Sequence, residues 1–176
     1  RLRWPHFVKV CKLARDNGAE VKAYILLKPP YLSEKESIED AVKSAIDAAP
    51  HVDKISINPV NVQKNTVVER LWFRNEWTAP WLWSVIEVLK QCEDLPIRIY
   101  SDPTGGGTRR GAHNCHECNK KVLEALKNHR LGLGDLKGLH CNCKPRWNTL
   151  VKQSKLRRNG SEPHGYRSGF AGSRHF

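Results

Sequence analysis

Three short apolar segments, each preceded by a helical pattern, limit most strongly what this chain can fold into. Residues 21–27, 52–57 and 96–100 have the length and apolar character of strands. Amphipathic helical patterns precede them at residues 4–17, at 33–49 and from Pro80 onward. Ser33 with Glu36 three residues later predicts a capping box at the start of the second helix, and the segment between the second strand and Pro80 is interpreted as irregular. Short connections between alternating helices and strands favour βα units on a parallel sheet. The sequence therefore predicts an α/β fold, in which the apolar run 21–27 is a strand buried on both faces.

Each predicted strand ends in a polar or proline-containing segment. In parallel sheets, ligands bind at the carboxyl ends of the strands, so the three ends predict one shared rim. Turn chemistry alone is the alternative, because Asn, Asp, Ser and Pro are common in turns. The predicted rim residues are Lys28, Asn58, Val60, Asn61, Asp102 and Thr104.

The formal net charge of +12 comes almost entirely from the second part of the chain. Residues 1–103 contain 15 Lys/Arg against 14 Asp/Glu, whereas residues 104–176 contain 15 against 4. Such a local excess is typical of a surface that binds phosphates; for the last 25 residues, a solvated basic tail without a partner is an equal alternative. We expect nucleic acid to contact Arg109, Arg110, Lys120, Lys121 and Arg146.

The apolar segments are all too short for a membrane helix, which needs roughly 18 uninterrupted apolar residues. The N-terminus also lacks the apolar stretch of a signal peptide. We therefore expect a cytoplasmic protein without a membrane partner. The chain begins at Arg1 and contains no methionine, which predicts that it is a fragment of a longer protein.

Four cysteines form two close pairs, Cys115 with Cys118 and Cys141 with Cys143. Twenty-two residues separate the pairs, and residues 120–129 are predicted to be a helix between them. Two short thiol spacings of this kind can converge on one tetrahedral ion, which favours structural zinc. An iron–sulfur cluster, a disulfide and unligated thiols are the alternatives, although a cytoplasmic location disfavours disulfides.

The three glycines at residues 105–107 precede Arg109 and Arg110. Glycine permits positive φ and a close approach of the backbone to a ligand, so this segment is either an anion-binding loop or a flexible linker, and Gly105 and Gly106 extend the predicted rim. The remaining cysteines and the tryptophan cluster are interpreted as core residues, with base stacking as the alternative for the tryptophans. These residues are Cys11, Cys92, Trp72, Trp77, Trp81 and Trp83.

Roughly residues 1–150 resemble a known family. The similarity is carried by VKAYILLKPPYLSEKESIEDAVKSAIDAA, DKISINPVNVQKNTVVERLW, PWLWSVIEVLK and IRIYSDPTGGGTRRGAHNC. These segments resemble the C-terminal half of the archaeosine-biosynthesis radical SAM proteins (RaSEA). More distantly, they resemble the wider radical SAM group related to Elongator subunit three. The pieces SINPVNVQ and SDPTGGG are specific to this resemblance, whereas the helices alone are not.

The resemblance implies the C-terminal part of a partial (βα) radical SAM barrel with an appended metal-binding lobe built on the four cysteines. It implies S-adenosylmethionine and a [4Fe–4S] cluster as cofactors, and tRNA as substrate. The family cleaves a C–N bond in a lysine adduct of a 7-deazaguanine base, which leaves archaeosine, after a partner transferase has installed the lysine. By their position at strand ends, the residues expected to contact S-adenosylmethionine or the substrate are Lys28, Asn58, Val60 and Asn61, with Asp102, Thr104, Gly105 and Gly106 on the same rim.

The family's cluster motif, CxxxCxxC, does not occur in these 176 residues. We therefore expect the cluster ligands in an N-terminal half outside this chain, and no radical chemistry from the chain alone. Two alternatives stay open: a noncatalytic, zinc-stabilised RNA-binding module, and a related radical SAM enzyme that acts on a small molecule. No residue is assigned a catalytic role. The expected organisation is a partial barrel at residues 1–104, a Gly-rich loop and four-cysteine lobe at 105–150, and a disordered basic tail at 151–176.

Overall fold

Helices and strands alternate along the computed structural model, which describes residues 3–153. The helices are α1 (Trp4–Asp16), α2 (Glu34–Ala48), the short 3₁₀ helix η1 (Ala49–His51), α3 (Val67–Phe73), α4 (Leu82–Gln91), α5 (His116–Leu131) and α6 (Lys144–Gln153). The strands are β1 (Lys22–Leu27), β2 (Lys54–Pro59) and β3 (Arg98–Ser101).

The three strands form one parallel sheet in the order β1-β2-β3. Tyr24 pairs with Ser56, and Ser56 pairs with Tyr100, so these three side chains share one row across the sheet. All three carboxyl ends lie at the same edge because every strand runs in the same direction. The predicted α/β fold with a parallel sheet is confirmed.

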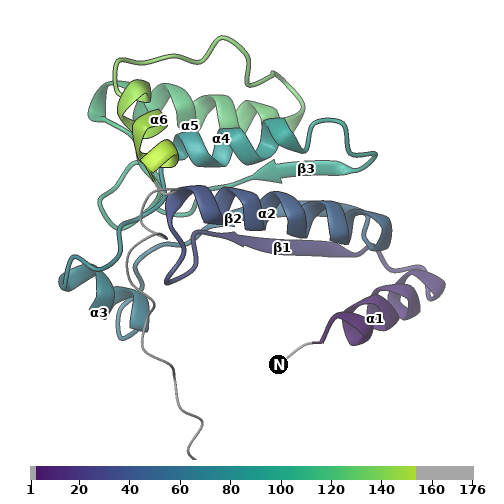
Figure 1. The fold of residues 1–176 in the computed structure, drawn as a ribbon. Helices are drawn as coiled ribbons and strands as arrows, with labels where there is room; N and C mark the ends of the chain where they lie inside the picture. The colour runs from purple at the N-terminus through teal and green to yellow at the C-terminus, as the bar shows by residue number, and fades with distance from the viewer. Residues whose placement is uncertain (1–2, 154–176) are drawn as a thin grey trace, which may run out of the picture.

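Helices α2, α4 and α5 lie on one side of the sheet (Figure 1). Leu27, Ile55 and Ile57 on the strands are fully buried under them, as are Val85 on α4 and Leu126 on α5. One continuous hydrophobic core thus contains residues from both sides of the boundary expected at residue 104. The division into a barrel part and a separate cysteine lobe stays a prediction.

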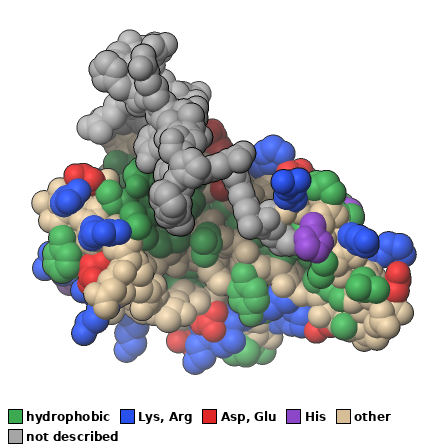
Figure 2. All heavy atoms as spheres, turned by 90° about the horizontal axis from the view of Figure 1, so that it is seen from below, with side chains coloured by type: hydrophobic (Ala, Val, Ile, Leu, Met, Phe, Trp, Pro, Cys, Tyr) green, Lys and Arg blue, Asp and Glu red, His purple; other side chains and the backbone are tan. Residues whose placement is uncertain are grey.

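The opposite face of the sheet is open, so the expectation of a strand buried on both faces is wrong for β1. Tyr24 is 63% exposed and Leu26 is 55% exposed, whereas Leu27, which points to the helices, is buried. Successive side chains of a strand point to opposite faces, and within residues 3–153 only one face of β1 has helices against it. Figure 2 shows the molecule from below, with green hydrophobic side chains at its surface.

Local sequence signals explain where α2 and α5 begin and end. Ser33 caps α2: its Oγ accepts from the backbone N–H of Glu36, whose carboxylate accepts from the N–H of Ser33, and the predicted capping box is confirmed. Helix α5 begins at His116, four residues before the expected start, with Cys115 as its N-cap, and ends at Gly132 in a left-handed conformation.

Two helices were not expected from the sequence. Helix α3 lies in the segment interpreted as irregular, where Thr66 caps it by accepting from the N–H of Glu69. Helix α6 follows Cys143 and extends through Gln153, and the rest of the tail predicted at 151–176 lies outside the described residues. Among residues 3–153, every helix is too short or too polar to cross a bilayer.

Candidate functional site

Four cysteines meet beside the N-termini of α5 and α6: Cys115 is the N-cap of α5 and Cys118 lies in its first turn, whereas Cys141 and Cys143 directly precede α6. The Sγ atom of Cys115 lies 3.6 Å from that of Cys118 and 3.5 Å from that of Cys141, and the Sγ atoms of Cys118 and Cys143 are 3.6 Å apart. All four Sγ atoms lie within 4.8 Å of one another. Tetrahedral zinc, with Zn–S bonds of about 2.3 Å, places its sulfurs about 3.8 Å apart. The predicted set of ligands is therefore brought together and can hold a metal ion such as zinc.

The same distances argue against two of the three alternatives, a disulfide and a [4Fe–4S] cluster. A disulfide needs an S–S distance of about 2.05 Å, and all six cysteines are free thiols. A [4Fe–4S] cluster would place its iron and sulfide ions inside the cage and push the thiolates apart. The cage fits a single ion.

Helix geometry and one tryptophan hold the cysteines in place. Sγ of Cys143 lies 3.3 Å from the indole Nε1 of Trp83, which donates to it. Trp83 belongs to α4 and is almost fully buried. The backbone N–H of Lys144 donates to Cys141 O, and that of Trp147 to Cys143 O, so the first turn of α6 forms on the CxC pair. The cage is thus anchored to the core of the α/β unit.

Two neighbouring thiols of the cage, Cys115 and Cys118, have pKa values shifted in opposite directions. Burial favours the neutral Cys115, but hydrogen bonds from the backbone N–H of Cys118 and from the neighbouring thiols outweigh it and lower the pKa of Cys115 to about 7. Burial, together with hydrogen bonding to Cys115 and Cys143, raises the pKa of Cys118 to about 12. A divalent cation would supply the charge that deprotonates all four, and metal binding would release protons.

A second candidate site is a hollow of about 600 Å³ on the open face of the sheet, at the ends of its strands. Tyr24, Leu26 and Tyr100 are among the residues that line it, together with the predicted rim residues. Lys22 places a positive charge beside this floor: its Nζ lies 4.4 Å from the ring centroid of Tyr24 and 5.0 Å from that of Tyr100, in cation–π contact with both. The predicted rim residues that the structure brings together here are Asn58, Val60, Asn61, Asp102 and Thr104.

Hydrogen bonds hold the polar rim of this hollow, one between two strand ends and two between residues close in the chain. Asn61 Nδ2 donates to the carbonyl oxygen of Thr104 at 3.2 Å, and Asn61 Oδ1 accepts from Gln63 at 2.7 Å. Asn58 Oδ1 accepts from Ser56 Oγ at 2.9 Å. The rim thus presents amide groups in a fixed arrangement over an aromatic and aliphatic floor.

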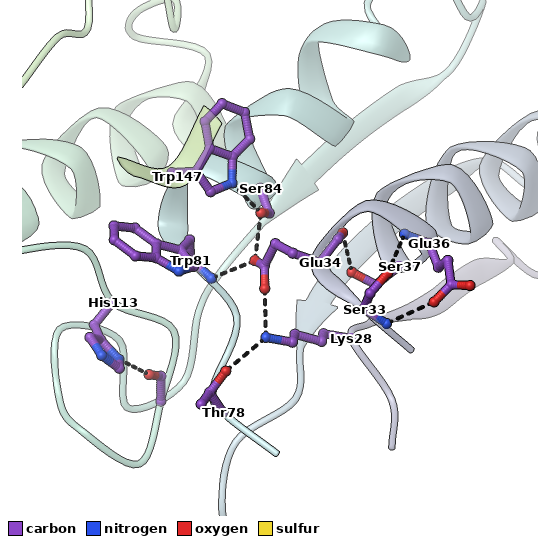
Figure 3. Close-up of polar contacts among 11 residues, drawn as sticks. Lys28, Ser33, Glu34, Glu36, Ser37, Thr78, Trp81, Ser84, His113 and Trp147 are labelled. Carbon is purple, nitrogen blue, oxygen red and sulfur yellow. Dashed lines mark hydrogen bonds and ion pairs between the residues drawn. The ribbon is translucent and has the colours of Figure 1, made fainter. Parts of the chain in front are cut away.

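Two of the remaining rim predictions, Gly105 and Gly106, do not line this hollow, and neither does Lys28. Lys28 is buried, and its Nζ lies 2.6 Å from Oε2 of Glu34 and donates to Thr78 Oγ1 at 3.0 Å (Figure 3). Its φ of 61° is in the left-handed region, which is unfavourable for a residue with a Cβ. The structure therefore places the Lys28 ammonium in an internal ion pair.

Glu34 is the centre of this buried polar network (Figure 3). Its Oε1 accepts from Ser84 Oγ at 2.6 Å and from the backbone N–H of Trp81 at 2.8 Å. Ser84 Oγ in turn accepts from the indole of Trp147, on α6, at 2.8 Å. The network joins the end of β1, the start of α2, the start of α4 and the helix that follows the CxC pair.

The Gly-rich segment is a closed series of turns. The N–H groups of Gly106, Gly107 and Thr108 donate to carbonyl oxygens of the same segment or of Ala112, which leaves these amides engaged. A Cβ on Gly111 would lie 2.2 Å from Gly105 O, so the backbone approaches itself closely at this point. These contacts favour an ordered connection over a flexible linker, and they give no support to an anion cradle.

The predicted nucleic-acid residues divide into an exposed group and one residue, Arg110, that is half-buried. Arg110 pairs with Glu69, donates to the carbonyl oxygen of Val62 at 3.1 Å and lies 5.2 Å from the ring centroid of Trp72. It fastens α3 to the Gly-rich segment. The exposed group consists of Arg109, Lys120, Lys121 and Arg146.

Several residues of the two sites were not found from the sequence. On β1, Lys22 shares its face with Tyr24 and the apolar Leu26, so the charge of Lys22 was the single signal for an open face. Glu34 gave no such signal. Acidic residues are common in the first turn of a helix, because they interact favourably with the helix dipole. Of the tryptophans interpreted as core, Trp77 and Trp83 are buried, and both Cys11 and Cys92 are buried as expected. Trp72 and Trp81 are half-buried against the core clusters.

Three archaeal proteins match most of the chain. Archaeosine synthase subunit beta of Methanosarcina acetivorans is 43% identical over 152 residues, which are 83% of this chain and 43% of that protein. Archaeosine synthase subunit beta of Thermococcus kodakarensis is 42% identical over 155 residues, 85% of this chain and 48% of that protein. An uncharacterized protein of Methanocaldococcus jannaschii is 34% identical over 151 residues, 82% of this chain and 41% of that protein.

The chain spans less than half the length of each of these relatives. No family model matches it. The predicted resemblance to proteins of archaeosine biosynthesis is nevertheless confirmed, because identity above 40% extends over more than four fifths of the chain. Over most of its length, the chain is homologous to part of archaeosine synthase subunit beta.

Proposed function

We propose that this chain is part of a tRNA-modifying enzyme of archaeosine biosynthesis. The homology to archaeosine synthase subunit beta carries this proposal. The name of these relatives describes one subunit of a synthase, which implies a partner subunit. We propose that the partner of this protein is a transferase that first attaches lysine to the 7-deazaguanine base. The excess of positive charge in the second part of the chain supports tRNA as the macromolecule that is bound.

The proposed reaction cleaves a C–N bond in the lysine adduct and leaves the formamidine group of archaeosine. S-adenosylmethionine, together with a [4Fe–4S] cluster, would supply the radical chemistry of this step. The cluster does not fit this chain, since the sequence has no CxxxCxxC and its one thiol cage suits a single ion. In our proposal its ligands belong to a part of the protein outside these residues, and the three strands belong to a partial (βα) barrel.

The open hollow fits S-adenosylmethionine in size and in chemistry. Its volume is about 600 Å³, which is within the usual range of pockets for small ligands and cofactors. The amides of Asn58 and Asn61 can donate and accept, the carboxylate of Asp102 accepts, and the Leu26 side chain offers an apolar surface. We propose that these residues bind and orient the cofactor and the modified base, with Val60 and Thr104 beside them. Lys28 would then act through Glu34 on the position of the β1 end.

The thiol cage has a structural role in this proposal. Four thiolates complete the tetrahedral shell of zinc, and a closed shell leaves no position for a substrate. The cage would fix α5 and α6 against α4 through Trp83 and Trp147. The protein is proposed to act in the cytoplasm, where tRNA is modified.

Binding and product formation together test this function. With the full-length protein, equilibrium dialysis should detect S-adenosylmethionine binding, and mass spectrometry of tRNA nucleosides should detect archaeosine when the partner transferase is present. We expect Asn58→Ala and Asn61→Ala each to weaken cofactor binding by about tenfold or more, because each removes a fixed amide from the rim. Asn148→Ala is the matched control, since this exposed residue of α6 lies outside the hollow.

The noncatalytic RNA-binding module is the second candidate. The exposed cations could bind RNA, and the four thiols could hold a metal ion, without any cofactor in the hollow. This module predicts tRNA binding that survives Asn58→Ala and Asn61→Ala unchanged, and no affinity for S-adenosylmethionine in the full-length protein. That combination would contradict the proposed enzyme. Loss of both cofactor binding and archaeosine in the two variants, with normal values for Asn148→Ala, would contradict the module.

A further inference from the structure

A groove beside α5 adjoins the hollow at the strand ends. Its volume is about 470 Å³. It runs between the end of β3 and one side of α5, whereas the hollow lies on the open face of the sheet. The side chains that matter for its chemistry are Asp102, Lys120, Leu123, Glu124, Lys127 and Arg130.

Two residues line both spaces, Asp102 and Arg130. Their ion pair is loose: Arg130 Nη1 lies 3.4 Å from Asp102 Oδ2, and the two side chains are 37% and 67% exposed. Exposed pairs of this kind hold their partners weakly. In addition, the Nε of Arg130 is buried and has no hydrogen-bond partner among the described residues. A phosphate would meet the exposed part of the guanidinium, where the loose contact of Nη1 with Asp102 is the ion pair to be exchanged.

The groove has a positively charged wall. Lys120 and Lys127 are seven residues apart on α5, which is about two helical turns or 10 Å, and both are exposed. Arg130 continues this side toward β3. Glu124 is the opposing charge, with its carboxylate 4.0 Å from Lys127 Nζ. Three cations against Glu124 and Asp102 leave the groove net positive.

The adjoining hollow indicates what kind of anion would suit this position. Its floor carries the largely exposed Tyr24 next to Lys22, and aromatic rings beside cations are typical of surfaces that stack unpaired bases. Arginine binds a phosphate through paired N–H donors. A nucleotide strand satisfies both spaces at once, because it carries a phosphate within one residue of every base.

We propose that the α5 groove binds a backbone phosphate of an RNA strand whose neighbouring nucleotide lies in the hollow. Arg130 exchanges Asp102 for that phosphate, and Lys127 and Lys120 contact the phosphates that follow. Asp102 is released toward the hollow by the same movement. The proposal rests on the proposed function in that the RNA is the tRNA substrate.

Equilibrium binding of three probes to the full-length protein tests this assignment. The probes are a tRNA transcript, a short single-stranded RNA and inorganic phosphate. We expect Arg130→Gln and Lys127→Gln each to weaken tRNA binding about fivefold at about 0.15 M salt, and to reduce the slope of log K against log salt by about 0.7 to 1. Lys43→Gln is the matched control, a lysine in an exposed helical ion pair on α2. It should change neither quantity.

Asp102→Asn gives a result of the opposite sign. If Asp102 competes with phosphate for Arg130, its neutral variant should bind tRNA about two- to fivefold more tightly. This gain should disappear in the Asp102→Asn, Arg130→Gln double variant. A gain that persists in the double variant would show that Asp102 acts through general charge and would overturn the exchange.

The arms of the experiment separate this proposal from the proposed function. Normal tRNA binding by Arg130→Gln and Lys127→Gln overturns the groove and leaves the function standing. Groove-dependent binding of the single-stranded RNA, without archaeosine formation, supports the groove and contradicts the function. If inorganic phosphate binds and neither RNA does, the groove is not an RNA site. If no probe binds, both are overturned.

Discussion

The thiol cage and the open hollow lie on the same three-stranded scaffold and differ in how complete they are. In the cage, every thiol lies within 4.8 Å of the other three, and a buried indole donates to one of them. In the hollow, Tyr24 and Leu26 remain more than half exposed although they stand on a strand of the sheet. The difference indicates that the four thiols of the cage enclose one another, whereas the hollow is bounded on one side by the sheet and open on the other.

The largest effect is expected where the complete site is broken. Cys115→Ser with Cys141→Ser removes one ligand from each pair, and we expect the zinc content to fall from about one per chain to zero. Structural zinc contributes about 10–16 kcal/mol of binding free energy in small zinc-dependent peptides. The variant should therefore lose ordered structure around α5 and α6. Elemental analysis and circular dichroism measure the two losses.

Cys92→Ala is the control for this variant. Cys92 is a buried cysteine that lies in the core outside the cage, so this change should leave zinc at about one per chain. Iron with a visible charge-transfer band in the unaltered protein would contradict the zinc assignment.

A smaller but still large effect is expected at the junction between the two regions. Glu34→Ala leaves Lys28 charged, 7% exposed and without its carboxylate, and removes the acceptor of Ser84. Breaking a buried ion pair in this way typically costs about 3–5 kcal/mol. We expect the free energy of unfolding, measured in urea through tryptophan fluorescence, to fall by that amount.

Glu39→Ala, on the same helix, is the matched control. Glu39 pairs with Lys35 at 3.2 Å, but its side chain is 62% exposed. Exposed pairs contribute about 0–1 kcal/mol. Equal losses from the two variants would show that the buried network contributes no more to stability than an exposed ion pair.

An intermediate effect is expected in the segment that connects the hollow to the cage. In Gly111→Ala, the new methyl group would lie 2.2 Å from Gly105 O, and the backbone must move. Overpacking of this kind typically costs about 1–3 kcal/mol. Gly134→Ala meets only Asn128 Cβ at 3.6 Å and should change the free energy of unfolding by less than about 0.5 kcal/mol. A flexible linker would tolerate both changes equally in thermal unfolding.

The complete region was also the one that the sequence predicted best. The spacing of Cys115, Cys118, Cys141 and Cys143 identified the four thiols that meet, because short thiol spacings limit where the side chains can point. The capping box at Ser33 and the parallel strands followed from equally local patterns. Each of these signals depends on residues close in the chain or on a strong apolar period.

The sequence failed where long-range contacts decide. The ion pair of Lys28 with Glu34 is completed by residues some 50 positions away, and no spacing encodes it. The exposed face of β1 was missed because an apolar run appears the same whether one face or two are covered. Arg110 was predicted to contact nucleic acid from its place in a basic segment. Only the fold shows that it binds Glu69 and Val62 and lies against the ring of Trp72.

The smallest effect on stability is expected at the open face, and it is the most direct test of the contrast between the two regions. Tyr24→Ser removes a ring that is 63% exposed, so the free energy of unfolding of this chain should change by only about 0.5 kcal/mol. Tyr31→Ser is the control, a tyrosine that is 81% exposed and does not line the hollow. Only Tyr24→Ser should weaken RNA binding, because stacking on an aromatic side chain contributes about 1–3 kcal/mol per base. A loss of stability above about 2 kcal/mol in Tyr24→Ser would mean that this face is packed within the chain, and the hollow would then be part of the core.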